Sequence, residues 1–162
     1  MSTQPRKVET THPAPESGIR YAAPCGLDCG RCVMCSHGKV AESARAILGV
    51  LGPNFARYAA FLQDMQPALV HYPAFAELLD AMAEGCCEGC RDRETPCHAS
   101  CRVPECTRAH GVDWCGLCPD FPCAETGLPD RLVEKWREAN TIIRDAGVDA
   151  WLRELAERPR YL

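Results

Sequence analysis

The chain is short, weakly acidic and rich in cysteine, and these properties exclude several classes of protein. It has 162 residues, 18 Lys and Arg against 22 Asp and Glu, a formal net charge of −4 and 13 cysteines. This length allows a single domain. The acidic balance disfavours a nucleic-acid partner, and no stretch approaches the roughly 18 apolar residues of a membrane span, so no membrane partner is expected.

The N-terminal sequence MSTQPRKVETTHPAPESGIR lacks the apolar core of a secretory signal. We therefore expect a cytoplasmic protein, whose thiols stay reduced. The odd number of cysteines also fits a disulfide framework poorly. Because residues 1–20 are polar and dotted with proline, they are predicted to be a disordered tail. Residues 21–158 are then predicted to form a single Cys-rich metal-binding domain.

A helical insert is predicted at about 39–84, where there is no cysteine. Gly52-Pro53 ends its first helix, Asn54 can cap the second, and Pro67 lies beyond that helix. Pro73 suits the first turn of a third helix, which Gly85 ends. Apolar residues recur at helical spacing and are interpreted as core. They are Val40, Ala44, Ile47, Leu48, Leu51, Phe55, Tyr58, Ala59, Leu62, Phe75, Leu78, Leu79 and Met82.

Two C-terminal helices are predicted at about 129–157. Pro129 opens the first, Gly147 separates the two, and Pro159 ends the second. Their inward positions are Leu132, Val133, Trp136, Ala139, Ile143, Val148, Trp151, Leu152 and Leu155. The fold class predicted is therefore mostly α: a small helical core with an irregular Cys-rich, metal-stabilised lobe at 86–123.

The stretch DWCGLCPDFPC, at 113–123, raises the question of redox catalysis. Its Cys115-x-x-Cys118 pair resembles that of a thioredoxin, in which the N-terminus of a helix lowers the pKa of the first thiol. Here Pro119 follows Cys118 directly and Pro122 comes soon after, so a helix cannot continue from Cys118. A turn that presents two thiolates to a metal fits this sequence better.

The cysteines fall into four constellations, each with short spacers that can aim several sulfurs at one ion. Glycines in or beside these turns, Gly26, Gly30, Gly89 and Gly116, allow tight backbone turns. The constellations are Cys25-x3-Cys29-x2-Cys32-x2-Cys35, then Cys86-Cys87-x2-Cys90, then Cys97-x3-Cys101-x4-Cys106, and Cys115-x2-Cys118-x4-Cys123. Four such clusters in one chain indicate metal binding.

Thiolate ligands suit Zn²⁺ and also iron–sulfur clusters. Cys25-x3-Cys29-x2-Cys32 matches the spacing that holds the [4Fe–4S] cluster of radical SAM enzymes, but this chain is too short for their usual barrel. The bacterial ferredoxin run is matched only in part. No phosphate loop, H-E-x-x-H or G-x-S-x-G is present. The five histidines are scattered, so the sequence favours a protein that is not an enzyme.

The motifs CGLDCGRC, CCEGCR, CRVPECTRAHGVDWCGLCPDFPC and GVDAWL, taken in this order, resemble the uncharacterised Cys-rich family called domain of unknown function 3795 (DUF3795). The resemblance covers roughly residues 21–155 and implies metal ligation, without implying a reaction. The family pattern maps onto Cys25, Cys29, Cys32, Cys87, Cys90, Cys101, Cys106, Cys115, Cys118 and Cys123. By the same comparison Cys35, Cys86 and Cys97 are additions.

The function predicted is a zinc-binding protein with structural thiolate sites, acting as a binding or regulatory module for an unknown protein partner. Ten family-pattern cysteines fill two four-thiolate sites, and all 13 would fill three, so two or three zinc ions are expected. Two alternatives remain: an iron–sulfur or thiol redox protein, and a metal-handling protein in which Cys35, Cys86 and Cys97 are labile ligands.

Overall fold

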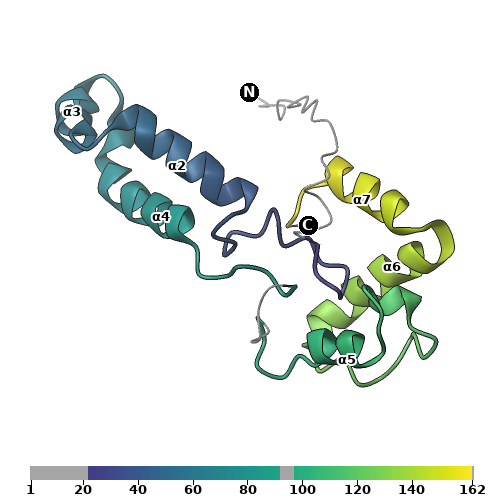
Figure 1. Ribbon diagram of the computed structural model, residues 1–162. Coiled ribbons are helices and arrows are strands. Elements are labelled where there is room, and N and C mark those ends of the chain that lie inside the picture. The colour runs from purple at the N-terminus through teal and green to yellow at the C-terminus, as the bar shows by residue number, and fades with distance from the viewer. Residues whose placement is uncertain (1–21, 92–96, 162) are drawn as a thin grey trace.

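The computed structural model describes residues 22–91 and 97–161, which form a projecting helical arm and a body that contains the remaining helices (Figure 1). The predicted tail at 1–20 lies outside the described residues. Within them six α-helices and three short 3₁₀ turns are present, and β pairing is limited to two isolated bridges. No helix of the described part is long and apolar enough to cross a membrane. The mostly α fold predicted from the sequence is confirmed.

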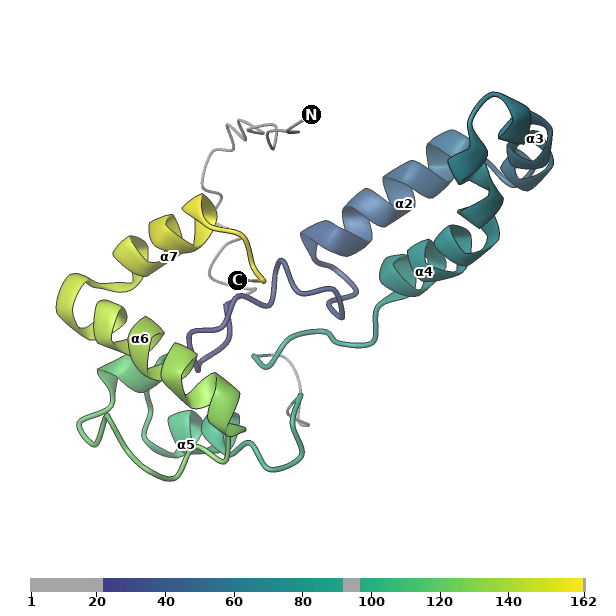
Figure 2. The same cartoon turned by 180° about the vertical axis from the view of Figure 1, so that it is seen from behind.

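The arm, residues 39–84, is a helical hairpin that projects from the body, as both views show (Figures 1 and 2). Helix α2 (Lys39–Leu51) packs against α4 (Tyr72–Glu84), and α3 (Phe55–Phe61) closes the far end with the 3₁₀ turns η1 (Leu62–Asp64) and η2 (Pro67–His71). Helix α2 ends at Gly52 and α4 at Gly85, as predicted.

The two chain segments that join arm and body pair with each other, and we call this region the neck. Cys35 and Cys87 form a parallel bridge. The backbone N–H groups of Cys86 and Cys87 both donate to the carbonyl oxygen of Met34, at 2.9 and 2.8 Å, and the Ser36 N–H donates to the Cys87 oxygen at 2.9 Å. The arm therefore leaves and re-enters the body at one place.

The body is organised around α6 (Asp130–Ala146), which packs against α7 (Val148–Glu157). Trp136, fully buried, belongs to one apolar cluster with Val103, Phe121 and Leu128. Further along α6, Ala139 and Ile143 belong to a second cluster with Trp114 and Trp151. The positions predicted to face inward on these two helices therefore do form core.

Two sequence interpretations are corrected by the fold. Asn54 occupies the position before α3 but its side chain makes no capping hydrogen bond. The lobe at 86–123 is less irregular than predicted, because Val103–Ala109 forms a helix, α5, with Pro104 in its first turn. Proline is well suited to that position, since its missing N–H would have no partner there.

The apolar stripes of the arm are also only partly core. Ala44, Ala59 and Leu79 are buried as predicted. Four other stripe residues are instead exposed to solvent: Ile47, Tyr58, Phe75 and Leu78. Periodicity identifies which residues share a face of a helix, but it does not say whether this chain covers that face.

Candidate metal centre

None of the thirteen cysteines forms a disulfide in the described part of the chain, and twelve of them gather into three groups that the sequence spacing does not reveal. Each group draws on segments far apart in the chain. The first thiol group contains Cys25, Cys29, Cys90, Cys97 and Cys101. The second contains Cys106, Cys115, Cys118 and Cys123, and the third contains Cys32, Cys35 and Cys87. Cys86 is exposed beside the third group.

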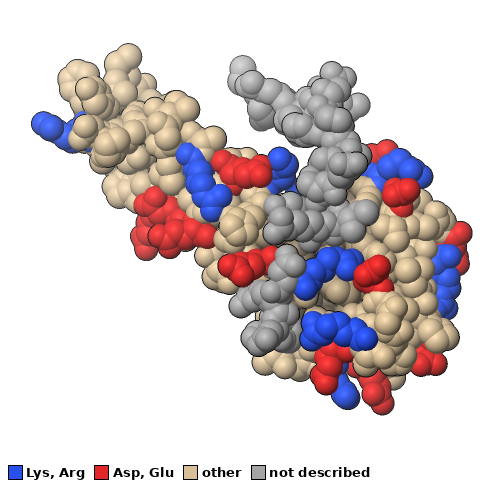
Figure 3. Space-filling view, in the orientation of Figure 1, with Lys and Arg blue, Asp and Glu red and all other residues tan. Residues whose placement is uncertain are grey.

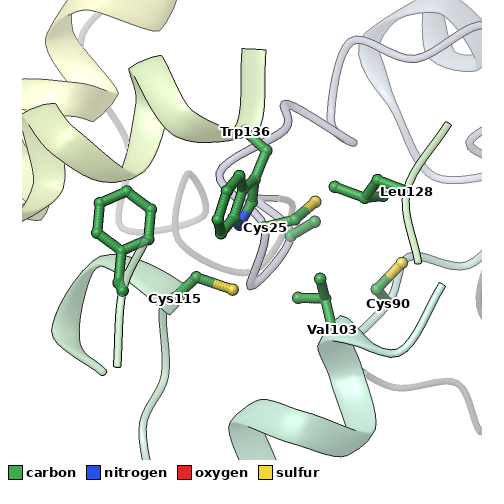
Figure 4. Close-up of a cluster of buried hydrophobic side chains, with 8 residues drawn as sticks. Cys25, Cys90, Val103, Cys115, Leu128 and Trp136 are labelled. Atoms are coloured by element: carbon green, nitrogen blue, oxygen red, sulfur yellow. The ribbon is translucent and has the colours of Figure 1, made fainter. Parts of the chain in front are cut away.

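The first thiol group lies where the N-terminal loop meets the chain on either side of residues 92–96. Burial raises the pKa of Cys25, and the nearby thiols of Cys90, Cys101 and Cys115 raise it further. The hydrogen bond with Cys29 raises the pKa of Cys90 to about 11. Figure 4 shows Cys25 and Cys90 close to Val103 and Leu128, with Cys115 and Trp136 alongside.

The second thiol group lines a small, partly open cavity. Its four cysteines line a space of about 20 Å³, together with Trp136 and Phe121, whose rings meet edge to face at a centroid distance of 5.0 Å. Cys106 lies on α5, and Cys115 begins the 3₁₀ turn η3 (Cys115–Leu117). Thiols from α5, from η3 and its end, and from the loop that follows therefore line the same small volume, beside the rings of Phe121 and Trp136.

The loop that carries Cys115 and Cys118 is held by α6. The Arg144 guanidinium donates to the carbonyl oxygens of Gly116, Cys118 and Phe121 at 3.0, 2.5 and 2.6 Å, and stacks 4.7 Å from the Phe121 ring centroid. The N–H of Gly116 donates to Asn140 Oδ1 at 2.8 Å. Three guanidinium donors and a buried amide therefore fix this loop through its backbone, leaving the thiols free for other partners.

The pKa of Cys115 identifies what kind of thiol it is. Burial raises it to about 11, and the neighbouring thiols of Cys106, Cys123 and Cys118 add to the rise. The indole N–H of Trp136 acts in the opposite direction, lowering this pKa, but it forms no hydrogen bond of normal geometry with any described residue. A redox-active thiol needs a lowered pKa, so Cys115 lacks the activation of a thioredoxin nucleophile.

The backbone after Cys115 also differs from that of a thioredoxin active site, in which a helix follows the first cysteine. Only one 3₁₀ turn follows, and Cys118, directly before Pro119, is extended with φ −73° and ψ 135°. The prediction that no helix runs on from Cys118 is confirmed.

The third thiol group lies in the neck. Cys35 is 1% exposed and sits in the bridge with Cys87. Burial raises its pKa, and Cys87 and Cys32 raise it further. The Tyr161 hydroxyl lies 3.6 Å from the Cys32 sulfur. The first Cys-rich run is therefore divided: Cys25 and Cys29 join one group, while Cys32 joins another.

Four cysteines share one backbone feature, a hydrogen bond to the sulfur from the N–H two residues further on. The Gly89 N–H lies 3.4 Å from Cys87 Sγ. Equivalent N–H groups act on the other three: those of Leu27 on Cys25, His37 on Cys35 and Val103 on Cys101. Such donors stabilise a thiolate, because hydrogen bonds to a charged acceptor are stronger than those to a neutral one.

His110 is a candidate ligand that the sequence analysis passed over as one of five scattered histidines. Among the described residues, the His110, Cys118 and Asp120 ligand atoms all lie within 4.8 Å of one another, a closer set than the thiol groups provide. His110 Nδ1 is also 3.6 Å from the Cys106 sulfur, at the edge of the second thiol group. Cys118 thus belongs to two possible ligand sets.

The ten family-pattern cysteines divide unevenly among these groups. Four are in the first thiol group, four form the whole of the second, and Cys32 and Cys87 are in the third. Of the three additions, Cys35 completes the third group, Cys97 contacts Cys90, and Cys86 remains outside. Asn140 and Arg144 were missed as supporting residues, although a polar residue inside the buried stripe of α6 is a signal that could have identified Asn140.

Comparison with known proteins gives one match. The family model described as "Protein of unknown function (DUF3795)" matches residues 21–127, a range that includes every cysteine. The match does not extend to the GVDAWL stretch of α7. No curated protein and no solved structure matches the chain.

Proposed function

Because the chain belongs to the DUF3795 family, whose function is unknown, we propose a function from its own thiols: a zinc-binding protein in which thiolate sites hold the body and neck together, serving as a binding or regulatory module for another protein. The first and second thiol groups would each hold one ion. The third offers three thiolates for a further ion.

The observation that carries this proposal is the second thiol group. Four cysteines are the number of ligands that a structural zinc site requires. Their cavity of about 20 Å³ is close to the roughly 10–15 Å³ that a single buried water molecule requires. That is room for one ion and far less than a four-iron cubane would need. A thiolate at Cys115 would also accept the buried Trp136 N–H, which otherwise has no partner among the described residues.

The division of the first Cys-rich run argues against the cluster of a radical SAM enzyme. A radical SAM cluster needs all three cysteines of its motif on one cluster. Here Cys25 and Cys29 lie with Cys90, whereas Cys32 lies with Cys35 in the neck. Zinc, which has no redox chemistry, would supply folding free energy and keep its ligand thiolates unreactive.

Elemental analysis of anaerobically purified, untagged protein tests the choice of metal. We expect two or three zinc ions per chain and no colour. Stoichiometric iron with sulfide, and less than one zinc, would reject the proposal.

His110→Ala tests the ligand set of the second ion. If four cysteines hold this ion, the variant keeps its zinc content, whereas a site built on His110, Cys118 and Asp120 loses one ion.

Chelation tests whether the metal is structural. Zinc contributes roughly 10–16 kcal/mol of apparent binding free energy in finger peptides, which exceeds or matches the roughly 5–15 kcal/mol stability of a typical domain. Under reducing conditions, a strong chelator should remove amide-exchange protection from residues 97–123 while much of the helical signal of the arm persists. Full protection of 97–123 after chelation would show that the metal is not structural.

A further inference from the structure

The outer part of the arm exposes an unusual amount of apolar side chain. Eight large apolar residues there are between 41% and 87% exposed, against three on the described part of the chain outside the arm. The eight are Ile47, Val50, Tyr58, Phe61, Met65, Val70, Phe75 and Leu78. We call this set the apolar arm surface. Scattered exposed apolar residues are normal, but a concentration of them in one part of the chain is typical of an interaction site.

The apolar arm surface follows the helices in ridges. Three pairs at i, i+3 spacing, which places both members on one side of a helix, occur on α2, α3 and α4: Ile47 with Val50, Tyr58 with Phe61, and Phe75 with Leu78. Ring contacts extend the ridge on α4, since Tyr72 stacks edge to face with Phe55 at 4.9 Å and lies 6.3 Å from Phe75. These are faces that a second helix can pack against.

The arm has little core of its own. In its described helices the buried residues are alanines and one larger residue, Leu79. A two-helix hairpin buries too little apolar surface to be stable alone, and small domains of this size commonly gain stability from a partner. Leu48 and Met82 pack against this small core, but the eight residues of the apolar arm surface remain exposed.

Charge indicates what the partner is. Residues 47–78, which span the apolar arm surface, carry one Arg and two acidic residues, Asp64 and Glu77, a net charge of only −1 within a chain of net charge −4. Figure 3 shows the outer arm largely free of charge, with acidic side chains nearer the body. A lipid-binding helix would have a polar face rich in Lys and Arg, and this segment has only Arg57. In a symmetric dimer the same surface of each chain faces the other, so a charged surface would bring like charges together. The eight side chains of the apolar arm surface are uncharged, and this repulsion is therefore absent.

We propose that the apolar arm surface is a homodimer interface, in which the arms of two chains pack side by side as a four-helix bundle around a two-fold axis. The exposed apolar area of these eight side chains is on the order of 800 Å², the contribution of each partner to a standard-size interface. This proposal is independent of the metal, since none of its residues lies in a thiol group.

Sedimentation equilibrium of the full, metal-loaded chain from about 1 to 100 µM tests it. The expected mass is twice the 17.8 kDa of one chain. Phe61→Glu combined with Val50→Glu should weaken association by at least tenfold, about 1.4 kcal/mol, with unchanged circular dichroism and zinc content. These two side chains are 78% and 87% exposed, so the variant should fold. Glu77→Gln, on the acidic side of α4, is the matched control and should leave the dimer intact.

Three results would overturn the proposal: a wild-type monomer at the highest concentration, a dimer that survives the double substitution, or co-sedimentation of wild type with phosphatidylcholine vesicles that the double substitution abolishes. The last result would assign the surface to lipid.

Discussion

The buried side-chain amide of Asn140 donates to the carbonyl oxygen of Cys25 at 2.9 Å, across 115 positions of sequence. The same amide donates to the Trp136 oxygen at 2.8 Å and accepts from the Gly116 N–H at 2.8 Å. One fully buried side chain on α6 therefore joins the loop of the first thiol group to the loop of the second. Because both loops bond to this one side chain, a change at Asn140 should affect the stability of both thiol groups.

Replacing Asn140 with Leu should destabilise both loops together. The change leaves the Gly116 N–H and the Cys25 carbonyl buried without partners, at a cost of roughly 1–3 kcal/mol for each. Urea denaturation of the metal-loaded protein measures the loss. Asn54→Ala is the control, because the Asn54 side chain makes no capping bond; its midpoint should match wild type. A Leu variant as stable as wild type would show that the bridge contributes nothing.

Gly116→Ala should also be destabilising, for a steric reason. A Cβ at Gly116 would lie 2.5 Å from the Asn140 carbonyl oxygen, a backbone atom that cannot move away cheaply. The matched substitution Gly49→Ala, within α2, meets no atom within 4 Å and should stabilise the chain by about 0.4–1 kcal/mol. Thermal denaturation of the two variants should therefore shift in opposite directions; shifts of the same sign would contradict the close approach of η3 to α6.

Native-state labelling distinguishes a metal ligand from a redox thiol at Cys115 and Cys118. Ligand thiolates are committed to the ion, so both should resist iodoacetamide until a chelator is added. Cys118→Ser should then lower both zinc content and solubility. Rapid labelling of Cys115 in the native protein, with unchanged zinc in the Ser variant, would instead identify a low-pKa nucleophile.

The third thiol group predicts how zinc stoichiometry depends on the additional cysteines. If Cys32, Cys35 and Cys87 hold an ion, Cys35→Ser should remove one zinc per chain and leave the other two. Cys97→Ser is a control of similar chemistry, since the first thiol group retains four cysteines without it. A wild-type content of two ions, unaffected by Cys35→Ser, would limit the metal sites to the first and second groups without affecting the case for zinc there.

Zinc binding should release protons, with an affinity that rises with pH. Cys90 and Cys115 have pKa values of about 11 without metal, so both are protonated at neutral pH and must lose their protons to ligate. In the metal-free protein, the free energy of unfolding changes with pH in the opposite direction and falls as the pH rises. Because these values are raised from the ordinary 9.0, the stability they contribute is complete below pH 9 and lost as the pH rises toward 11. Calorimetry in buffers of different ionisation enthalpy measures the proton release; none at pH 7 would contradict thiol ligation.

Local sequence signals were sufficient for most helices. Gly52, Gly85 and Gly147 end α2, α4 and α6 as predicted, because glycine readily adopts the positive φ found after a helix. Helix α5 was not predicted, although it has ordinary start signals, Pro104 and Glu105 in the first turn.

The grouping of the cysteines could not be predicted in the same way. The spacing indicates that Cys29 and Cys32 can approach one ion. In the fold, however, Cys29 packs against the cluster that contains Trp136 of α6, whereas Cys32 lies with Cys35 in the neck. Glycines illustrate the same limit. Gly26 and Gly116 were expected to allow tight backbone turns around a metal, whereas the closest atoms to a Cβ at either belong to α6, at Ala139 and Asn140. Tertiary packing, which is absent from a local pattern, determines both outcomes.

The pairing of Cys35 with Cys87 makes the arm an insertion in the topological sense. Its entry and exit are joined by backbone hydrogen bonds, so residues 39–84 contribute to the chain length without separating the segments they interrupt. A short turn in their place would close the same gap at little entropic cost. On this architecture a hairpin of another length or surface can replace the arm without moving the first and second thiol groups.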